Sequence, residues 1–232
     1  MNLYRDTHAL ESELLHRYRL HIGNIFTKSS GGFAIMNDSL IRENFHRQVL
    51  NPDHACPKTL VIDELGLNHG ECRADIAVIN GKLSGYEIKS DLDSLVRLKR
   101  QIRAYDTIFQ SASIVVAPRH LRKVIRTVPL HWGICVCLPN ADSGVTFWRA
   151  RPASENTHPE PVAIAQLLWR DEAAEILKSL GASARSLKQP RAELYKQLAD
   201  ALELSELTSR VIGALKDRKN WRRPAPPFEC GG

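Results

Sequence analysis

Asp75, Glu87 and Lys89 have the types and the order that metal-dependent phosphodiester chemistry requires. Carboxylates are the hard oxygen ligands that Mg²⁺ prefers, and Mg²⁺ takes only one or two of them from a protein, keeping water and substrate phosphate in its other positions. The metal activates a bound water, and a lysine beside it orients that water or stabilises charge developing on the phosphate. We therefore expect Asp75 and Glu87 to bind Mg²⁺, or Mn²⁺ in its place, and Lys89 to support the attacking water.

Two strands joined by a tight turn are expected to carry these groups. The segments 74–79 and 83–88 are rich in Ile, Val, Ala and Tyr, and the Asn-Gly pair at 80–81 is a strong hairpin signal. Successive side chains of a strand point to opposite faces, so Glu87 and Lys89 share one face. Both faces also carry apolar residues, and the charges are therefore expected to be paired or to bind a metal.

The length of the turn decides whether Asp75 joins that face. A two-residue loop places Asp75 opposite Tyr86, on the other face. A three-residue loop of residues 79–81, with the glycine at 81 left-handed, places Asp75 opposite Gly85 and diagonal to Glu87. The chemical interpretation therefore predicts the three-residue loop, with Gly85 leaving open space above the sheet between the two acids.

The order of Glu64, Asp75 and the Glu-Ile-Lys triplet at 87–89, followed by a helix, resembles the PD-(D/E)XK nuclease superfamily, the fold of many restriction enzymes and Holliday-junction resolvases. The resemblance implies a restriction-endonuclease-like mixed sheet flanked by helices, and hydrolysis of DNA. It assigns metal binding to Asp75 and Glu87, assistance of the water to Lys89, and a further catalytic and metal-binding role to Glu64. Ala74 stands where the superfamily often has proline. The run 59–117 also resembles a group of bacterial and phage proteins assigned to this superfamily without a well-defined activity.

The choice of the extra acid leaves alternatives open. Asp63 and Glu64 are adjacent and point to opposite faces, and the family spacing favours Glu64. Glu43, on the helix expected after Asp38, is another alternative.

Residues beside these acids are candidates for binding nucleic acid. Gln101 and Tyr105 resemble the Q-x-x-x-Y element of nucleases related to the RecB exonuclease domain, which lies beside the site and contacts DNA. The basic candidates for phosphate contacts are Arg73, Arg97, Arg100, Arg119, Arg122 and Lys123. A run of charges on a helix is also typical of a solvated face, so both interpretations stay open.

An alternative metal group is offered by residues of the ligand types that zinc uses, His54, Cys56, His69 and Cys72. The segment between the two pairs contains an expected strand, and the spacing matches no usual zinc knuckle. Five cysteines in a chain without an export signal are instead expected to be reduced thiols.

The composition is that of an ordinary globular protein. The 232 residues are 43% hydrophobic and 25% charged, with a net charge of +6. A basic balance fits a polyanionic partner, and DNA is the expected one. The N-terminal stretch has charges among its apolar residues, which excludes a signal peptide or a spanning helix and predicts a cytoplasmic protein without membrane contact.

The pattern of strands followed by helices predicts an α/β core with a small C-terminal helical subdomain. The expected organisation is an N-terminal arm at 1–37, a core at 38–150, a Pro-rich linker at 151–162, a helical subdomain at 163–223 and a disordered tail at 224–232. Within the subdomain, helices are expected at 163–180, 191–204 and 207–221.

A rival to the nuclease is a nucleic-acid-binding or protein-assembly module that keeps the fold without cleavage. The sequence does not separate DNA from RNA, or cleavage at ends from cleavage at internal sites, and it leaves a homodimer open.

Overall fold

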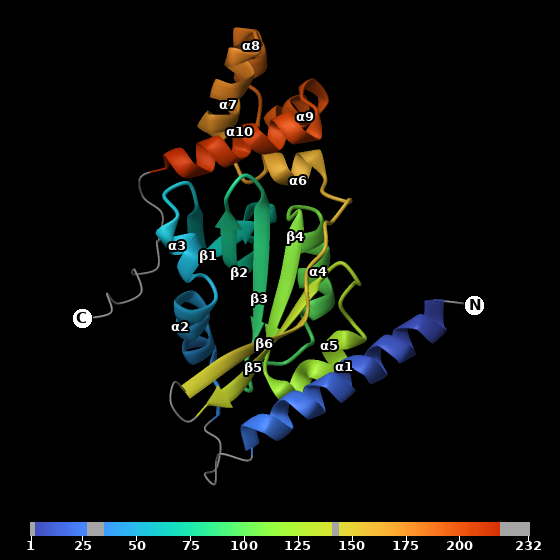
Figure 1. Ribbon diagram of the computed structural model, residues 1–232. Helices are drawn as coiled ribbons and strands as arrows, with labels where there is room; N and C mark the ends of the chain where they lie inside the picture. Colours follow the sequence, from blue (N-terminus) through green and yellow to red (C-terminus); the bar gives the residue numbers. More distant parts are fainter. Residues whose placement is uncertain (1–2, 27–34, 141–143, 219–232) are drawn as a thin grey trace, which may run out of the picture.

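The computed structural model describes residues 3–26, 35–140 and 144–218, and a six-stranded mixed sheet forms its centre (Figure 1). The strands lie in sequence order from one edge to the other. They are β1 (Leu60–Leu67), β2 (Cys72–Ile79), β3 (Leu83–Lys89), β4 (Ser111–Val116), β5 (Gly133–Asn140) and β6 (Gly144–Arg151). β1 to β3 form an antiparallel meander, β3 to β5 are parallel, and β6 returns antiparallel. The expectation of a mixed α/β sheet flanked by helices is confirmed.

Helices cover both faces of this sheet (Figure 1). One face packs against α2 (Asp38–Gln48), through Ile41 and Phe45, with α3 (Asn51–Ala55) beside it. The other face packs against α4 (Leu98–Asp106) and α5 (Leu121–Ile125). The helix α1 (Leu3–Phe26) lies along α5 and β6. Strands buried on both faces read as nearly continuous apolar runs, as β4 does.

Five helices gather over one end of the sheet (Figure 1). They are α6 (Pro161–Ala165), α7 (Arg170–Ser179), α8 (Ala184–Leu187), α9 (Arg191–Ala201) and α10 (Leu204–Asp217). Their buried apolar residues belong to the same cluster as those of the sheet and α4. Arg218 fastens this group, because its guanidinium bonds to Glu172 and to the carbonyl of Leu167 and lies 4.2 Å from the ring centre of Trp169.

Several boundaries differ from those expected. The helix expected at 163–180 is divided into α6 and α7, and α8 was not foreseen. The N-cap of α2 is Asn37, whose side chain accepts from the Leu40 N–H. The helix after Lys89 begins only at Leu98. Residues 27–34 of the expected arm and the expected tail at 224–232 lie outside the described residues. No helix in the described ranges has the length and apolar character needed to cross a membrane.

The turn between β2 and β3 also corrects a detail. Ile79 pairs with Leu83, so the three-residue loop is Asn80 to Lys82, one position later than expected. Gly81 is left-handed there, with φ 92°, as the turn type requires. The side chains that share a face are nevertheless those expected.

Gly85 does not leave open space. A Cβ atom at this position would lie 2.6 Å from the ring of Phe109, which is fully buried. The ring after α4 therefore fills the space above the strand, and glycine is needed so that it can approach the backbone.

We predict that Gly85→Ala lowers the free energy of unfolding by about 1 to 3 kcal/mol, because the Phe109 ring must move out of a packed core. Urea denaturation followed by circular dichroism measures this. Gly213→Ala in α10 is the matched control: nothing lies within 4 Å of its added Cβ, and alanine stabilises a helix interior by about 0.5 to 1 kcal/mol. Equal effects of the two changes would contradict the packing argument.

Candidate functional site

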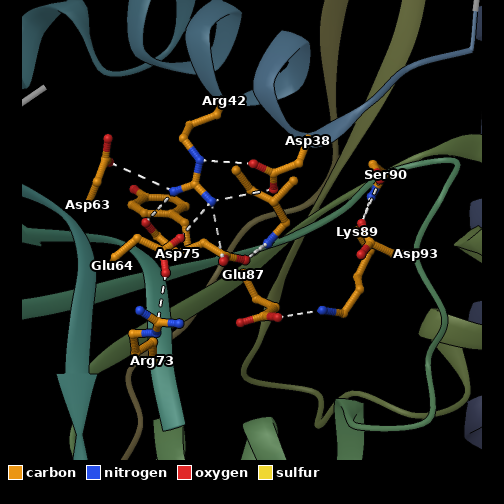
Figure 2. Close-up of polar contacts among 12 residues, drawn as sticks. Asp38, Arg42, Asp63, Glu64, Arg73, Asp75, Glu87, Lys89, Ser90 and Asp93 are labelled. Atoms are coloured by element: carbon orange, nitrogen blue, oxygen red, sulfur yellow. Dashed lines mark hydrogen bonds and ion pairs between the residues drawn. The ribbon is translucent and has the colours of Figure 1, made fainter. Parts of the chain in front are cut away.

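Asp75, Glu87 and Lys89 gather where β2 and β3 separate (Figure 2). The paired register of these strands ends at Ile76 and Tyr86, and residues 75 and 87 face each other just beyond it. At this point the backbone N–H groups of the two strands bond to side chains instead of to each other. The Ile88 N–H donates to Oδ2 of Asp75 over 2.6 Å, and the Asp75 N–H donates to the Tyr105 hydroxyl over 3.2 Å.

Glu87 is the most deeply buried charge of the group, with no exposed surface. The Lys89 ammonium donates to its Oε1 over 2.5 Å, and the Tyr105 hydroxyl donates to its Oε2 over 2.7 Å. The amide of Gln101 donates to the same Oε1 as Lys89. Burial raises the pKa of Glu87, while the Lys89 cation opposes that shift. The carboxylate is thus held by one cation and two neutral donors.

Asp75 is partly buried, and its side chain is 20% exposed. Burial first, and then the negative charge of Glu87, raise the pKa of Asp75 to about 7. The Ile88 N–H and the cations of Arg42 and Lys89 act in the opposite direction. Two carboxyl groups in one desolvated site resist holding two negative charges together.

Arg42 of α2 is the central cation on the exposed side of this cluster. It was not among the site residues predicted from the sequence. Its guanidinium reaches the Asp75 carbonyl over 2.6 Å, Oδ1 of Asp75 over 3.4 Å, Oε1 of Glu64 over 3.1 Å and Oδ1 of Asp38 over 3.1 Å (Figure 2). The only local signal for it was the spacing of four residues between Asp38 and Arg42, which is common on helix surfaces. Its contacts with β1 and β2 are non-local and leave no trace in a short motif.

Glu64 interrupts β1 with a left-handed backbone, φ 57°, between two paired residues. This conformation strains a residue with a Cβ atom, by about 1 to 3 kcal/mol, and it turns the side chain toward the cations of Arg42 and Arg73. Asp63, the alternative acid, instead accepts from His46 over 2.9 Å, with Arg42 at 4.0 Å. Glu64 is therefore joined to Asp75 through Arg42.

A hollow of about 270 Å³ opens beside the cluster. Its lining includes Glu64, Arg73, Asp75, Arg97, Arg100 and Gln101. The Oε1 atom of Gln101 is buried and has no hydrogen-bond partner. The structure thus brings the expected acids together with four of the expected nucleic-acid-binding residues.

Tyr105 is fully buried and belongs to the cluster, where its hydroxyl joins α4 to Glu87 on β3, but it does not line the hollow. The remaining basic candidates lie elsewhere. Arg119 donates to the carbonyl of Asp91, and Arg122 pairs with the buried Glu11 of α1. Lys123 is exposed on α5. The part of these residues in binding nucleic acid stays a prediction.

The donor set does not suit a resident metal ion as it stands. Both oxygens of Glu87 accept from Lys89, Gln101 or Tyr105, and both oxygens of Asp75 accept from Ile88 or Arg42. Mg²⁺ requires carboxylate oxygens that are free to coordinate it. The described residues contain no group of three or more His, Cys, Asp or Glu that could hold a metal ion.

The residues of the alternative zinc group also have other partners. His54 bonds to His46 over 2.9 Å, whereas the ring of His69 stacks on Tyr195 of α9 at 5.5 Å between centres. Burial raises the pKa of the Cys72 thiol. His54 and His69, from the two halves of this alternative group, therefore make different contacts.

These features define a mixed α/β protein in which a buried cluster of two carboxyl groups and a lysine lies beside a hollow rimmed by arginine. The chain belongs to the family of bacteriophage P4 protein cII, whose model matches residues 41–223. The protein named "Protein cII" of Enterobacteria phage P4 is 28% identical over 158 residues, which cover 68% of this chain and 59% of that relative. The chain thus spans less than two thirds of the relative's length. No solved structure matches.

This family corrects the expectation of a nuclease. The chain belongs to a family defined by phage protein cII and not by a hydrolase or an endonuclease, so the function deduced from Asp75, Glu87, Lys89 and Glu64 is wrong. The expected resemblance to phage proteins is consistent with membership of this family. The geometry gives a physical reason for the error: the acids and the lysine are close together, but Glu87 is paired with Lys89 and Asp75 with Arg42.

The raised pKa of Asp75 makes stability depend on pH. Its folded pKa of about 7 lies above the ordinary value of 3.8, so between these two values the folded state binds more protons than the unfolded state. The contribution of Asp75 to stability is therefore fully present below about pH 4 and is lost as pH rises to about 7, by up to about 4 kcal/mol.

We predict that Asp75→Asn, which keeps an acceptor for the Ile88 N–H, is more stable than the wild type at pH 8 and close to it at pH 4. Urea denaturation at both pH values gives the difference in free energy of unfolding. Asp171→Asn, on the exposed surface of α7, serves as the control for the loss of one negative charge. A difference for Asp75→Asn that does not grow with pH would contradict the assignment.

Proposed function

We propose that this protein binds DNA without cleaving it, through the exposed face of α4 and the hollow beside it. The observation that carries the proposal is a group of cations on one helix. Arg97, Lys99, Arg100 and Arg103 are all exposed, and none of them pairs with a carboxylate within the described part of the chain.

These four cations lie together because of helix geometry. At about 100° per residue, positions 97, 99, 100 and 103 fall on one side of α4, opposite the buried Leu98, Ile102 and Tyr105. Like charges three and four residues apart destabilise a helix by a few tenths of a kcal/mol per pair. A row of phosphates along this face would reverse the sign of that interaction.

The hollow extends the basic face toward β2. Arg73 and Arg97 stand on its rim, and Arg100 reaches across to the carbonyl of Glu71 over 2.6 Å. Contacts of arginine with phosphate position a protein on DNA without reading its sequence.

The buried carboxylate supports this surface. Glu87 accepts from two side chains of α4, Gln101 and Tyr105, and so fixes the helix against β3. We therefore assign Asp75, Glu87 and Lys89 to positioning the binding helix. The role that follows is regulatory rather than hydrolytic, because the protein would occupy DNA and leave it intact.

We also propose that the sheet is of the restriction-endonuclease-like type, a fold kept without its chemistry. Three antiparallel strands, β1 to β3, followed by parallel ones, with acids at the separation of β2 and β3, support this proposal.

Fluorescence anisotropy with a labelled DNA duplex at increasing salt tests the function. We expect the double variant Arg97→Gln/Arg100→Gln to bind about tenfold or more weakly at low salt, and to lower the slope of log K against log salt by about 2, one for each lost phosphate contact. Recovered DNA should be intact after incubation with Mg²⁺.

The control for that measurement is Lys178→Gln/Lys196→Gln, which removes two exposed cations from α7 and α9. It should leave the salt slope nearly unchanged. A wild type that shows no salt-dependent binding, or two double variants that weaken binding equally, would remove α4 as the DNA-binding surface.

A further inference from the structure

A second hollow, of about 280 Å³, lies on the other face of the sheet from α4. It is bounded by α2, by β3 to β6 and by the residues that follow β6. Phe45, Val49, Tyr86, Cys135 and Phe147 of its lining belong to the apolar cluster under α2. Nothing in the function proposed above uses it.

Three aromatic rings form one wall of this hollow. The ring of Phe45 meets Tyr86 and Phe147 with centres 5.2 Å apart in both cases, at 60° and 78°. Inclined rings at this distance are a favourable aromatic arrangement, and together they present flat apolar surface to the space between α2 and the sheet. Such a wall suits a planar apolar group.

Two arginines of β6 supply positive charge to the same hollow. Arg151 is only 8% exposed, and its Nε and Nη2 donate to the carbonyls of Trp132 and Pro129 over 2.8 Å each. Its Nη1 is buried and has no hydrogen-bond partner. Burial lowers the pKa of Arg151 to about 10, and no carboxylate of the described chain offsets its charge.

Arg149 adds a second cation at the exposed side of the hollow. It pairs across the sheet with Cys135 and makes no ion pair with any described residue. The hydroxyl groups of Ser111 and Ser113, on β4, also line the hollow and have no hydrogen-bond partner in the described ranges. Cations and hydroxyls therefore converge on one space without an anion.

A buried cation without a counter-charge is costly, and the cost falls if an anion of suitable shape occupies the space beside it. Ligand sites in proteins combine apolar walls with a few converging polar groups, and the volume here corresponds to a small ligand. We propose that this aromatic hollow binds a small organic anion, in which a carboxylate or phosphate group faces the β6 arginines and a planar ring packs on Phe45, Tyr86 and Phe147.

The test is isothermal titration of the full chain with phenyl phosphate and with benzoate. Both should bind with a stoichiometry of one, since each combines a ring with an acid group. Benzyl alcohol has the ring without the charge, and inorganic phosphate has the charge without the ring. Each of these should bind at least tenfold more weakly, because each loses one half of the site.

Two variants locate the binding. Arg149→Gln removes an exposed cation, and Ser111→Leu fills the hollow from β4; each should weaken both probes about tenfold or more, with unchanged circular dichroism. Arg100→Gln, the same charge change on the opposite face of the sheet, is the matched control and should bind the probes as the wild type does. This control also separates the inference from the proposed function, since Arg100 belongs to the DNA-binding face.

Three results would overturn the proposal. One is the absence of binding of both probes to folded wild-type protein at millimolar concentration. Another is inorganic phosphate binding as tightly as phenyl phosphate, which would mean a site for charge alone. The third is an equal loss of affinity in Arg149→Gln and Arg100→Gln, which would mean a general effect of net charge.

Discussion

The carboxyl group of Glu87 has no contact with water, and a buried charged group must be paired and hydrogen-bonded. The protein meets this demand with Lys89 from the same strand and with Gln101 and Tyr105 from α4. The position of α4 on the sheet therefore depends on one buried acid. Because the exposed side of α4 carries its cations away from the core, the same interaction also sets where the basic surface lies.

The contact between Tyr105 and Glu87 also affects the place where β2 and β3 separate. The Tyr105 hydroxyl accepts from the Asp75 N–H and lies 3.1 Å from the Tyr86 carbonyl, so it occupies the place of a backbone bond between the strands. Asp75 in turn accepts from the Ile88 N–H. Buried backbone groups must find partners, and here side chains supply them once the strands no longer pair. The cluster that looks like a catalytic group thus completes a sheet.

Local patterns predicted much of this structure. Alternation along β3 placed Glu87 and Lys89 on a common face, and apolar periodicity located the sheet and the C-terminal helices. Asp75 joined that face only through the choice of a three-residue loop, and it lies opposite Glu87 rather than opposite Gly85. Non-local packing escaped prediction. Phe109 fills the space over Gly85, and Arg42 comes from α2 to hold Asp75 and Glu64, neither of which any short motif encodes. The functional error has the same origin, because residue types show which chemistry a group permits, while the partners of each oxygen decide whether the group is available for it. The match to the phage P4 cII family is the finding that overturned the function deduced from residue types alone.

Strand β3 gives the two faces of the sheet a common structural element. The ring of Tyr86 forms part of the aromatic wall under α2, and the next residue, Glu87, sends its carboxylate to α4 on the opposite side. A single planar peptide unit joins these two residues, and that unit is rigid. The separation of the Cα atoms of Tyr86 and Glu87 is therefore fixed by covalent geometry, and a shift of the β3 backbone at this point carries the base of both side chains with it.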